Sequence, residues 1–236
     1  MSLDPAPGWL PAGRRVYAVG DIHGCADRLR ALHRRIAEDL AAAPIRHVSI
    51  VYLGDYIDRG PDTVGVLDEL LHESPLLGLP RVHLKGNHEA SLSAALSGDL
   101  AAATDWLLGG GKASLQSWGL PAEAPPTTWA SGIPAAHRAF IDGLALTYHA
   151  GGYVFVHAGV RPGVLLADQT PEDLTSIRNA FLNSSADFGA VVVHGHTPQH
   201  APAIRPNRIG IDTAAVFGGR LTCLVLEGEG LAFLQE

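Results

Sequence analysis

The sequence is poor in the features that mark several classes of protein. Only two cysteines, Cys25 and Cys223, occur in 236 residues, which excludes a disulfide framework but leaves one disulfide bond open. No uninterrupted apolar stretch is long enough to span a bilayer, so we expect no membrane partner. Residues 1–13 are rich in Pro, Ala and Gly and lack the apolar segment of a signal peptide. A cytoplasmic location is therefore the expectation.

Charge is also sparse. Asp, Glu, Lys and Arg make up 17% of the chain, and the net charge is −7 with no basic run. Because protein surfaces that bind nucleic acid need clustered positive charge, we expect no nucleic-acid partner. An anionic substrate would have to be held locally, by bound metals or single arginines. The hydrophobic share of 47% is typical of a globular protein, and the length fits a single domain over residues 1–236.

One pattern recurs along the chain: a short apolar run is followed directly by residues that can bind a metal. The five pairs are 16–20 before Asp21 and His23, 48–54 before Asp55, 81–86 before Asn87 and His88, 153–156 before His157, and 190–193 before His194 and His196. Short Val-rich runs that end in Gly or polar residues are typical of buried strands.

Helices are predicted between these strands. Residues 26–42 have apolar positions at helical spacing, a second helix is expected from Pro61 to about residue 73, and Thr170 is the expected N-cap of a third. Near the end, 208–212, 221–226 and 231–234 are predicted strands, the last two as an antiparallel pair. Alternating strands and helices indicate an α/β fold, in which ligands bind beyond the carboxyl ends of the strands. The five clusters should therefore converge on one rim.

The middle of the chain, about residues 90–150, has a different composition. It contains three consecutive glycines from Gly109, a Pro-rich stretch near Pro125, and the tryptophans Trp106, Trp118 and Trp129. We interpret it as a mostly helical insertion with a loop near Pro125. Two roles remain open for it, a cap over the site or peripheral packing. The tryptophans are interpreted as packing residues.

The metal-binding residue types define a chemistry. The set comprises Asp21, His23, Asp55, Asn87, His157 and His196. Mixed oxygen and nitrogen ligands suit Mn, Fe or Zn, and the absence of cysteine ligands argues against a structural zinc site. Six ligands are too many for one catalytic ion with an open position, but they suit two divalent ions that share a bridging carboxylate.

The chain resembles a known family at these positions. The segments 20–24 (GDIHG), 54–60 (GDYIDRG) and 86–89 (GNHE) are similar to the three signatures of the calcineurin-like metallophosphoesterases, and 157–159 (HAG) and 195–197 (GHT) follow in order. The serine/threonine phosphoprotein phosphatase branch, and its bacterial and phage members in particular, is the most similar. The resemblance implies two β-sheets packed face to face and flanked by helices.

The resemblance also implies roles for the metal ligands. Asp21 and His23 would bind the first metal, Asp55 would bridge both, and the second would be bound by Asn87, His157 and His196. Mn²⁺ is the expected ion, with Fe or Zn as alternatives. His194 matches no ligand position, and we expect it to pack at the end of its strand.

Four further residues are expected to act on the substrate. The resemblance implies that Arg59 binds phosphate oxygens, and a planar guanidinium suits bidentate contacts of that kind. Arg178 is the second expected phosphate ligand, with Arg161 as a weaker substitute. His88 would protonate the leaving oxygen while Asp58 orients its ring.

The implied reaction is a single in-line attack on phosphorus by a bridging metal-bound hydroxide. The expected activity is that of a serine/threonine protein phosphatase, extending to phosphotyrosine, with a phosphoprotein or a small phosphomonoester as substrate. The alternative is a nucleotide hydrolase similar to the symmetrical diadenosine tetraphosphatases, and a non-catalytic metal-binding scaffold is a third hypothesis. The middle segment has few basic residues, only Lys112 and Arg138, which favours the phosphatase. One departure from the family is Ala214, where many relatives have Gly.

Overall fold

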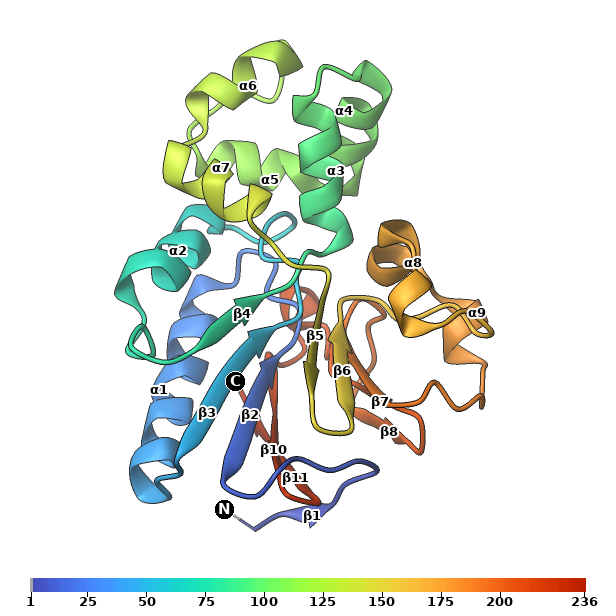
Figure 1. Ribbon diagram of the computed structural model, residues 1–236. Helices are drawn as coiled ribbons and strands as arrows, with labels where there is room; N and C mark the ends of the chain where they lie inside the picture. Colours follow the sequence, from blue (N-terminus) through green and yellow to red (C-terminus); the bar gives the residue numbers. More distant parts are fainter. Residues whose placement is uncertain (1) are drawn as a thin grey trace.

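The computed structural model describes residues 2–236, which form two β-sheets (Figure 1). The first sheet has the strand order β1-β11-β10-β2-β3-β4, and the second has the order β5-β6-β7-β9-β8. The strands are β1 (Asp4–Pro5), β2 (Arg14–Val19), β3 (His47–Tyr52), β4 (Arg81–His83), β5 (Thr147–Ala150), β6 (Tyr153–Val156), β7 (Val191–His194), β8 (Ala203–Arg205), β9 (Arg208–Gly210), β10 (Thr222–Glu227) and β11 (Gly230–Gln235). The strands β2, β3 and β4 are mutually parallel, as are β6, β7 and β9. The expected antiparallel pairing of β10 with β11 is confirmed.

The alternation of side chains along β2 explains how the layers pack. Val16 and Ala18 belong to the core between the two sheets, whereas Tyr17 and Val19 belong to the core beneath the outer helices. All four side chains are fully buried. Because successive residues of a strand point to opposite faces, a strand covered on both faces must be apolar throughout. This is why β2 is an uninterrupted apolar run from Val16 to Val19 in the sequence.

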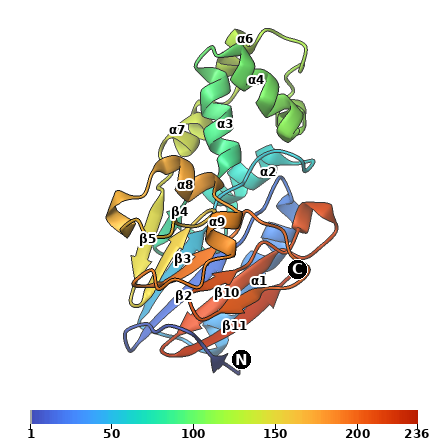
Figure 2. The same cartoon turned by 90° about the vertical axis from the view of Figure 1, so that its right-hand side faces the viewer.

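Helices cover both outer faces. Helix α1 (Ala26–Ala42) lies against the first sheet and has the predicted bounds, while α8 (Pro171–Ser176) and α9 (Asn179–Leu182) lie against the second (Figures 1 and 2). The predicted N-cap is confirmed, because the side chain of Thr170 accepts the backbone N–H of Asp173. The α/β architecture of two packed sheets flanked by helices is therefore as expected.

The second predicted helix starts later than expected and changes its geometry. It begins not at Pro61 but with α2 (Thr63–Asp68), because the carboxylate of Asp62 caps the helix by accepting the backbone N–H of Gly65. It continues as the π-helical turn η1 (Glu69–Glu73). The chain also contains two short 3₁₀ turns, η3 (Leu166–Asp168) and η4 (Ala215–Phe217).

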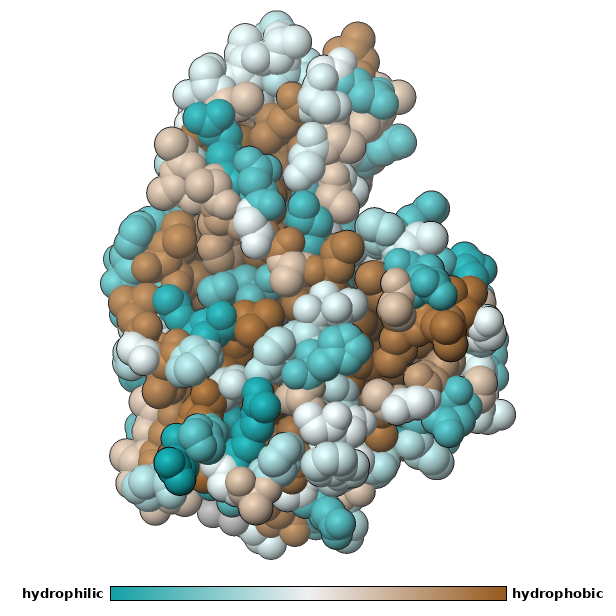
Figure 3. All heavy atoms as spheres, in the orientation of Figure 1, coloured by the Kyte–Doolittle hydropathy of each residue, from teal (hydrophilic) through white to brown (hydrophobic). Residues whose placement is uncertain are grey.

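The middle segment forms a helical lobe above the carboxyl ends of the parallel strands (Figures 1 and 2). It contains α3 (Asn87–Leu96), α4 (Leu100–Trp106), the π-helical turn η2 (Leu107–Gly111), α5 (Lys112–Ser117), α6 (Pro126–Gly132) and α7 (Ala135–Asp142). In the space-filling view the surface is indented between this lobe and the α8–α9 region (Figure 3). The helical segment ends earlier than the expected boundary at residue 150. Strand β5 follows α7, the last helix of the lobe, and pairs with β6, so it belongs to the second sheet.

The remaining expectations concern cysteines and the membrane. Cys25 and Cys223 are both free thiols, so the disulfide left open by the sequence does not form. Within residues 2–236, none of the helices combines the length and the apolar character needed to cross a membrane.

Candidate metal centre

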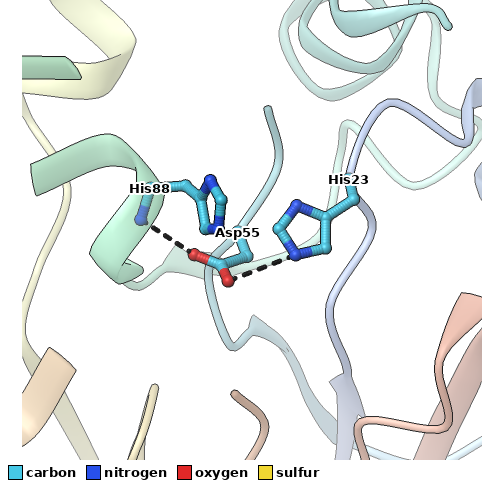
Figure 4. A group of neighbouring side chains, drawn as sticks. All are labelled: His23, Asp55 and His88. Atoms are coloured by element: carbon cyan, nitrogen blue, oxygen red, sulfur yellow. Dashed lines mark hydrogen bonds and ion pairs between the residues drawn. The ribbon is translucent and has the colours of Figure 1, made fainter. Parts of the chain in front are cut away.

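The other five expected metal ligands gather around Asp55, and all six follow the ends of β2, β3, β4, β6 and β7. The Oδ2 atom of Asp55 lies 3.3 Å from Nε2 of His23 and 3.4 Å from Nε2 of His157. Figure 4 shows His23 and His88 beside Asp55, with the ring of His23 at one carboxylate oxygen and the backbone N–H of His88 at the other. Asp55 thus takes part in two groups of potential ligands, one with His23 and His88 and one with His157 and His196.

The remaining two expected ligands lie in the same place. The amide oxygen of Asn87 is 3.2 Å from Nε2 of His157 and 2.8 Å from Nδ1 of His196. The Oδ2 atom of Asp21 accepts the backbone N–H of His196 at 2.9 Å. Side chains from both sheets therefore converge as the sequence predicted. His194 is not among them, since its ring packs edge-on against Phe181 with centroids 5.0 Å apart.

The residues present fit a binuclear metal site. The buried atoms Oδ1 of Asp21 and Nε2 of His196 have no hydrogen-bond partner among residues 2–236. Unpaired buried polar atoms are costly, and metal coordination is a way to satisfy them. The carboxylates of Asp21, Asp55 and Asp212 are all buried within this region. Several buried carboxylates side by side need compensating positive charge, which two divalent cations would supply.

The protonation of the site without metal reflects the same charges. Burial opposes charge on His157, but the neighbouring Asp55 outweighs it and raises the pKa of His157 to about 10. The same balance raises the pKa of His23 to about 9. Burial and the charge of Asp212 hold the pKa of Asp21 well above its usual range. In the opposite direction, burial and the charges of His157 and Arg178 lower the pKa of His196 to about 3.

The backbone around the site is strained. Apart from Ala214, every residue other than glycine with a positive φ lies in the expected site, among residues 2–236: His23 (45°), Asp55 (52°), Asp58 (71°), Arg59 (67°) and His196 (65°). The left-handed region costs residues with a Cβ atom about 1–2 kcal/mol each. Such strain persists only where the surrounding structure fixes it, and it concentrates at functional sites. Close packing of the same backbone explains the glycine at position 60, because a Cβ atom there would collide with the backbone oxygen of His23.

Glu89 is a structural residue of the site for which the sequence analysis assigned no role. Its fully buried carboxylate accepts four backbone N–H groups, from Asp55 (3.0 Å), Tyr56 (2.8 Å), Ile57 (3.3 Å) and Gly86 (2.9 Å). It thereby ties the loop after β3 to the start of α3. A glutamate at the third position of a helix that follows a glycine was the available signal.

The residues expected to act on the substrate surround this centre. The Nη1 atom of Arg59 lies 2.8 Å from Nε2 of His23, and its guanidinium lies over the exposed ring of Phe217, 5.6 Å from the centroid. The Nδ1 atom of His88 lies 2.7 Å from Oδ2 of Asp58, and both side chains are buried. Although His88 lies close enough to His23 and Asp55 to be a ligand, its Nδ1 is already taken by Asp58. Only Nε2 of His88 is therefore left for a further partner.

The two candidate arginines of the α8–α9 region differ in their partners. Arg178 is exposed at the start of α9, close enough to His196 to depress the pKa of that ring. Arg161 instead pairs with Asp173 through two contacts of 2.7 and 2.5 Å. An arginine with both arms on a carboxylate is not free to bind phosphate, so the geometry favours Arg178.

The fold and the site define a metal-dependent phosphoesterase, and comparisons with known proteins agree. The family described as calcineurin-like phosphoesterase matches residues 14–221, so the chain belongs to the calcineurin-like metallophosphoesterases, a family of hydrolases. It is 30% identical over 226 residues to serine/threonine-protein phosphatase 1 of Salmonella typhimurium, covering 89% of this chain and 90% of that protein.

Two further relatives have names that refer to nucleotides. The chain is 27% identical over 230 residues to the asymmetrical bis(5'-nucleosyl)-tetraphosphatase PrpE of Anoxybacillus flavithermus, covering 87% of this chain and 88% of that protein. A crystal structure provisionally described as a diadenosine tetraphosphatase superposes with a TM-score of 0.67 at 23% identity, covering 96% of this chain and 95% of the other. At that identity the likeness shows the fold.

Proposed function

We propose that this protein is a serine/threonine protein phosphatase that hydrolyses phosphomonoesters at a binuclear metal site. The observation that carries the proposal is the position of Arg59 and of the His88–Asp58 pair next to His23 in the Asp55-centred ligand cluster. The Nη1 atom of Arg59 lies 2.8 Å from Nε2 of His23, and the rings of His23 and His88 have centroids 4.6 Å apart. Arg59 offers a cation for phosphate oxygens, and His88 offers a proton donor for a departing alkoxide. The 30% identical relative named as a serine/threonine-protein phosphatase supports the same substrate class.

The proposed ligands divide at Asp55. Asp21 and His23 would hold one ion, Asn87, His157 and His196 the other, and Asp55 both. When bound, a pair of divalent ions polarises phosphate oxygens and lowers the pKa of a coordinated water, so that a nucleophile exists near neutral pH. Mn²⁺ is our expected ion, with Fe or Zn as alternatives, because the ligand set mixes oxygen and nitrogen donors.

The protein's own groups perform the rest of the reaction in this proposal. Arg59 and Arg178 bind non-bridging oxygens and stabilise the charge that accumulates on the phosphoryl group. His88 donates a proton to the leaving oxygen, since an alkoxide is a poor leaving group without one. The carboxylate of Asp58 accepts the Nδ1–H of His88, which fixes the ring and leaves Nε2 as the atom that carries the transferred proton.

A nucleotide hydrolase is the second candidate, and the relatives named as bis(5'-nucleosyl)-tetraphosphatases favour it. The metal-binding residues serve either substrate, because both reactions are in-line displacements at phosphorus. The exposed ring of Phe217 beside Arg59 is compatible with a base or with a peptide side chain. The helical lobe is poor in basic residues, with only Lys112 and Arg138, which favours the phosphomonoester.

The two candidates are separated by one assay. Metal-free protein is titrated with Mn²⁺ and assayed in parallel on p-nitrophenyl phosphate, a phosphoserine peptide and diadenosine tetraphosphate. We expect activity on the first two and little on the third. A strong preference for the dinucleotide would transfer the protein to the nucleotide hydrolases, and its products, two ADP or ATP plus AMP, would give the cleavage symmetry. Absence of turnover with Mn, Fe and Zn would refute both candidates.

A further inference from the structure

The helical lobe contacts the acid–base pair directly. Trp106, the last residue of α4, is 2% exposed, and its indole Nε1–H donates to Oδ2 of Asp58 at 2.8 Å. Ser114 of α5 is fully buried, and its hydroxyl donates to Oδ1 of Asp58 at 2.6 Å. The same hydroxyl accepts the backbone N–H of Asp58 at 2.8 Å. Two helices of the lobe thus hold one side chain of the loop after β3.

The hydrogen bonds around Asp58 determine which nitrogen of His88 carries its hydrogen. An indole N–H is only a donor, so Oδ2 of Asp58 acts as an acceptor toward Trp106. The second contact of Oδ2 is Nδ1 of His88, at 2.7 Å. Ser114 supplies the hydrogen to Oδ1, since its hydroxyl already accepts from the backbone. With both oxygens accepting, Nδ1 of His88 carries a hydrogen whether the ring is neutral or charged. The second hydrogen of the imidazolium therefore lies on Nε2, from which it can pass to the leaving oxygen.

Packing alone does not explain the contact of Trp106. Trp129 of α6 is 1% exposed and adjoins Trp106, with ring centroids 5.5 Å apart. Its buried Nε1 has no hydrogen-bond partner among residues 2–236. The same small core therefore contains two buried indoles, of which one donates to Asp58. This makes Trp129 a matched comparison for the hydrogen bond of Trp106.

A third contact joins the lobe to the neighbouring phosphate-binding residue. The backbone N–H of Arg59 donates to the backbone oxygen of Gly110 at 3.2 Å. Gly110 has a φ of 124°, and a Cβ atom there would lie 2.7 Å from Cγ of Arg59. The π-helical turn η2 between α4 and α5 therefore requires glycine at position 110, because a side chain there would prevent the close contact with Arg59. The lobe touches two consecutive residues of the site, Asp58 and Arg59.

We propose that Trp106 and Ser114 are positioning residues for general-acid catalysis, and that the lobe is a built-in support of the acid–base pair. The inference rests on the proposed function. Trp106 and Ser114 act through Asp58, and they hold its carboxylate so that the ring of His88 presents Nε2 toward the leaving oxygen. In this proposal the lobe does more than pack at the periphery, which was one of the two roles left open by the sequence.

The test uses Trp106→Phe in the Mn²⁺-loaded full-length protein, with Trp129→Phe as the control. Both variants lose a buried indole N–H, but one of these N–H groups binds Asp58 and the other has no partner. The assay measures kcat and KM on aryl phosphates whose leaving phenols range from strongly to weakly acidic. A good leaving group needs little protonation, so a defect in proton donation grows as the phenol becomes less acidic.

We expect Trp106→Phe to reduce kcat about tenfold on phenyl phosphate and on a phosphoserine peptide. On 2,4-dinitrophenyl phosphate the loss should be below about twofold, with KM little changed. Trp129→Phe should stay within about twofold of wild type on every substrate. In a His88→Asn background, Trp106→Phe should have no further effect, because residues that act as a unit are not additive.

The opposite results are equally clear. A loss that is uniform over all leaving groups, or equal in Trp129→Phe, would overturn the inference while leaving the proposed function intact. Wild-type protein without activity on any of these esters would instead overturn the proposed function and the inference with it. If Trp106→Phe does not fold, as judged by circular dichroism, Ser114→Ala is measured in the same series, and a uniform loss there would also refute the inference.

Discussion

The buried carboxylate of Glu89 accepts the backbone N–H of Asp55 at 3.0 Å and so fixes the residue on which both groups of potential metal ligands depend. The same carboxylate accepts three other backbone N–H groups of the two adjoining loops. Because four donors bind its two oxygens, the side chain of Glu89 is held in one orientation. Glu89 therefore holds Asp55 in its strained left-handed conformation without contacting a substrate.

We expect Glu89→Gln to lower both the stability and the metal affinity. An amide has one accepting oxygen, and its NH₂ group would face two of the four backbone donors. Two unsatisfied N–H groups would cost about 2–4 kcal/mol of unfolding free energy. Urea unfolding and calorimetric titration with Mn²⁺ measure the two effects. Glu38→Gln, at an exposed position of α1, is the control and should match wild type. A Glu89→Gln protein of wild-type stability would refute this role.

Much of the fold and the ligand cluster could be predicted because the signals are local. Each predicted strand near the site is a short apolar run, and residues such as Asp21 and His157 follow directly after it. Parallel strands end at one edge, so the topology brings these residues together. The helix at 26–42 was predicted to the residue because its apolar stripe is regular.

What could not be predicted depends on contacts between distant segments. Trp106 and Asp58 are 48 positions apart, and nothing near either residue indicates that an indole donates to that carboxylate. Trp129 is a tryptophan of the same segment, so the sequence does not distinguish it from Trp106, yet its role is packing alone. Strand β5 was assigned to the insertion because its four residues carry no alternation that marks a strand without its partner β6.

Metal binding should release protons and strengthen as the pH rises. In the metal-free protein the pKa of His23 is about 9 and that of His157 about 10, so both rings are protonated at pH 7. A ligand histidine must be neutral, so binding displaces these two protons together with any proton held by the carboxyl of Asp21, whose pKa is also raised, and the affinity for Mn²⁺ rises with pH until about pH 9–10. Titration calorimetry in two buffers with different ionisation enthalpies gives the number of protons directly.

The same shifts set the sign of a stability effect. A histidine whose pKa is raised on folding stabilises the folded state below its unfolded pKa of about 6.5, and this contribution is lost as the pH rises through the folded value. Metal-free protein should therefore lose stability progressively between about pH 6.5 and about pH 10, where this contribution is gone. His157→Asn should release about one proton fewer on binding Mn²⁺. Proton release near zero in the wild type at pH 7 would contradict the assignment of these rings as ligands.

Substitutions of Arg178 and Arg161 should have different effects on kcat/KM. Arg178→Ala removes an exposed cation beside His196, and we expect kcat/KM on a phosphomonoester to fall about tenfold, as for loss of one charged contact to phosphate. Arg161→Ala breaks a pair with Asp173 and should change kcat/KM less than about twofold. Because Arg161 is largely exposed, its loss should change the stability little. The reverse order of effects on kcat/KM would make Arg161 the phosphate ligand.

Ala214 has a left-handed backbone, with a φ of 59°. Many members of the family that the sequence resembles have glycine at this position. The conformation costs a residue with a Cβ atom about 1–2 kcal/mol, while glycine loses about 0.4–1 kcal/mol through the greater freedom of the unfolded chain. Ala214→Gly should therefore stabilise the protein by up to about 1 kcal/mol.

The neighbouring residue provides the matched control for this substitution. Ala215 lies in the 3₁₀ turn η4, is 3% exposed, and does not have a positive φ. Ala215→Gly gains no relief of strain and loses a buried methyl group, so it should destabilise the protein by about 1 kcal/mol or more. Urea unfolding of both variants in the presence of a chelator measures these opposite signs without a contribution from bound metal. If both substitutions destabilise, the left-handed strain at Ala214 is too small to outweigh the entropy of glycine.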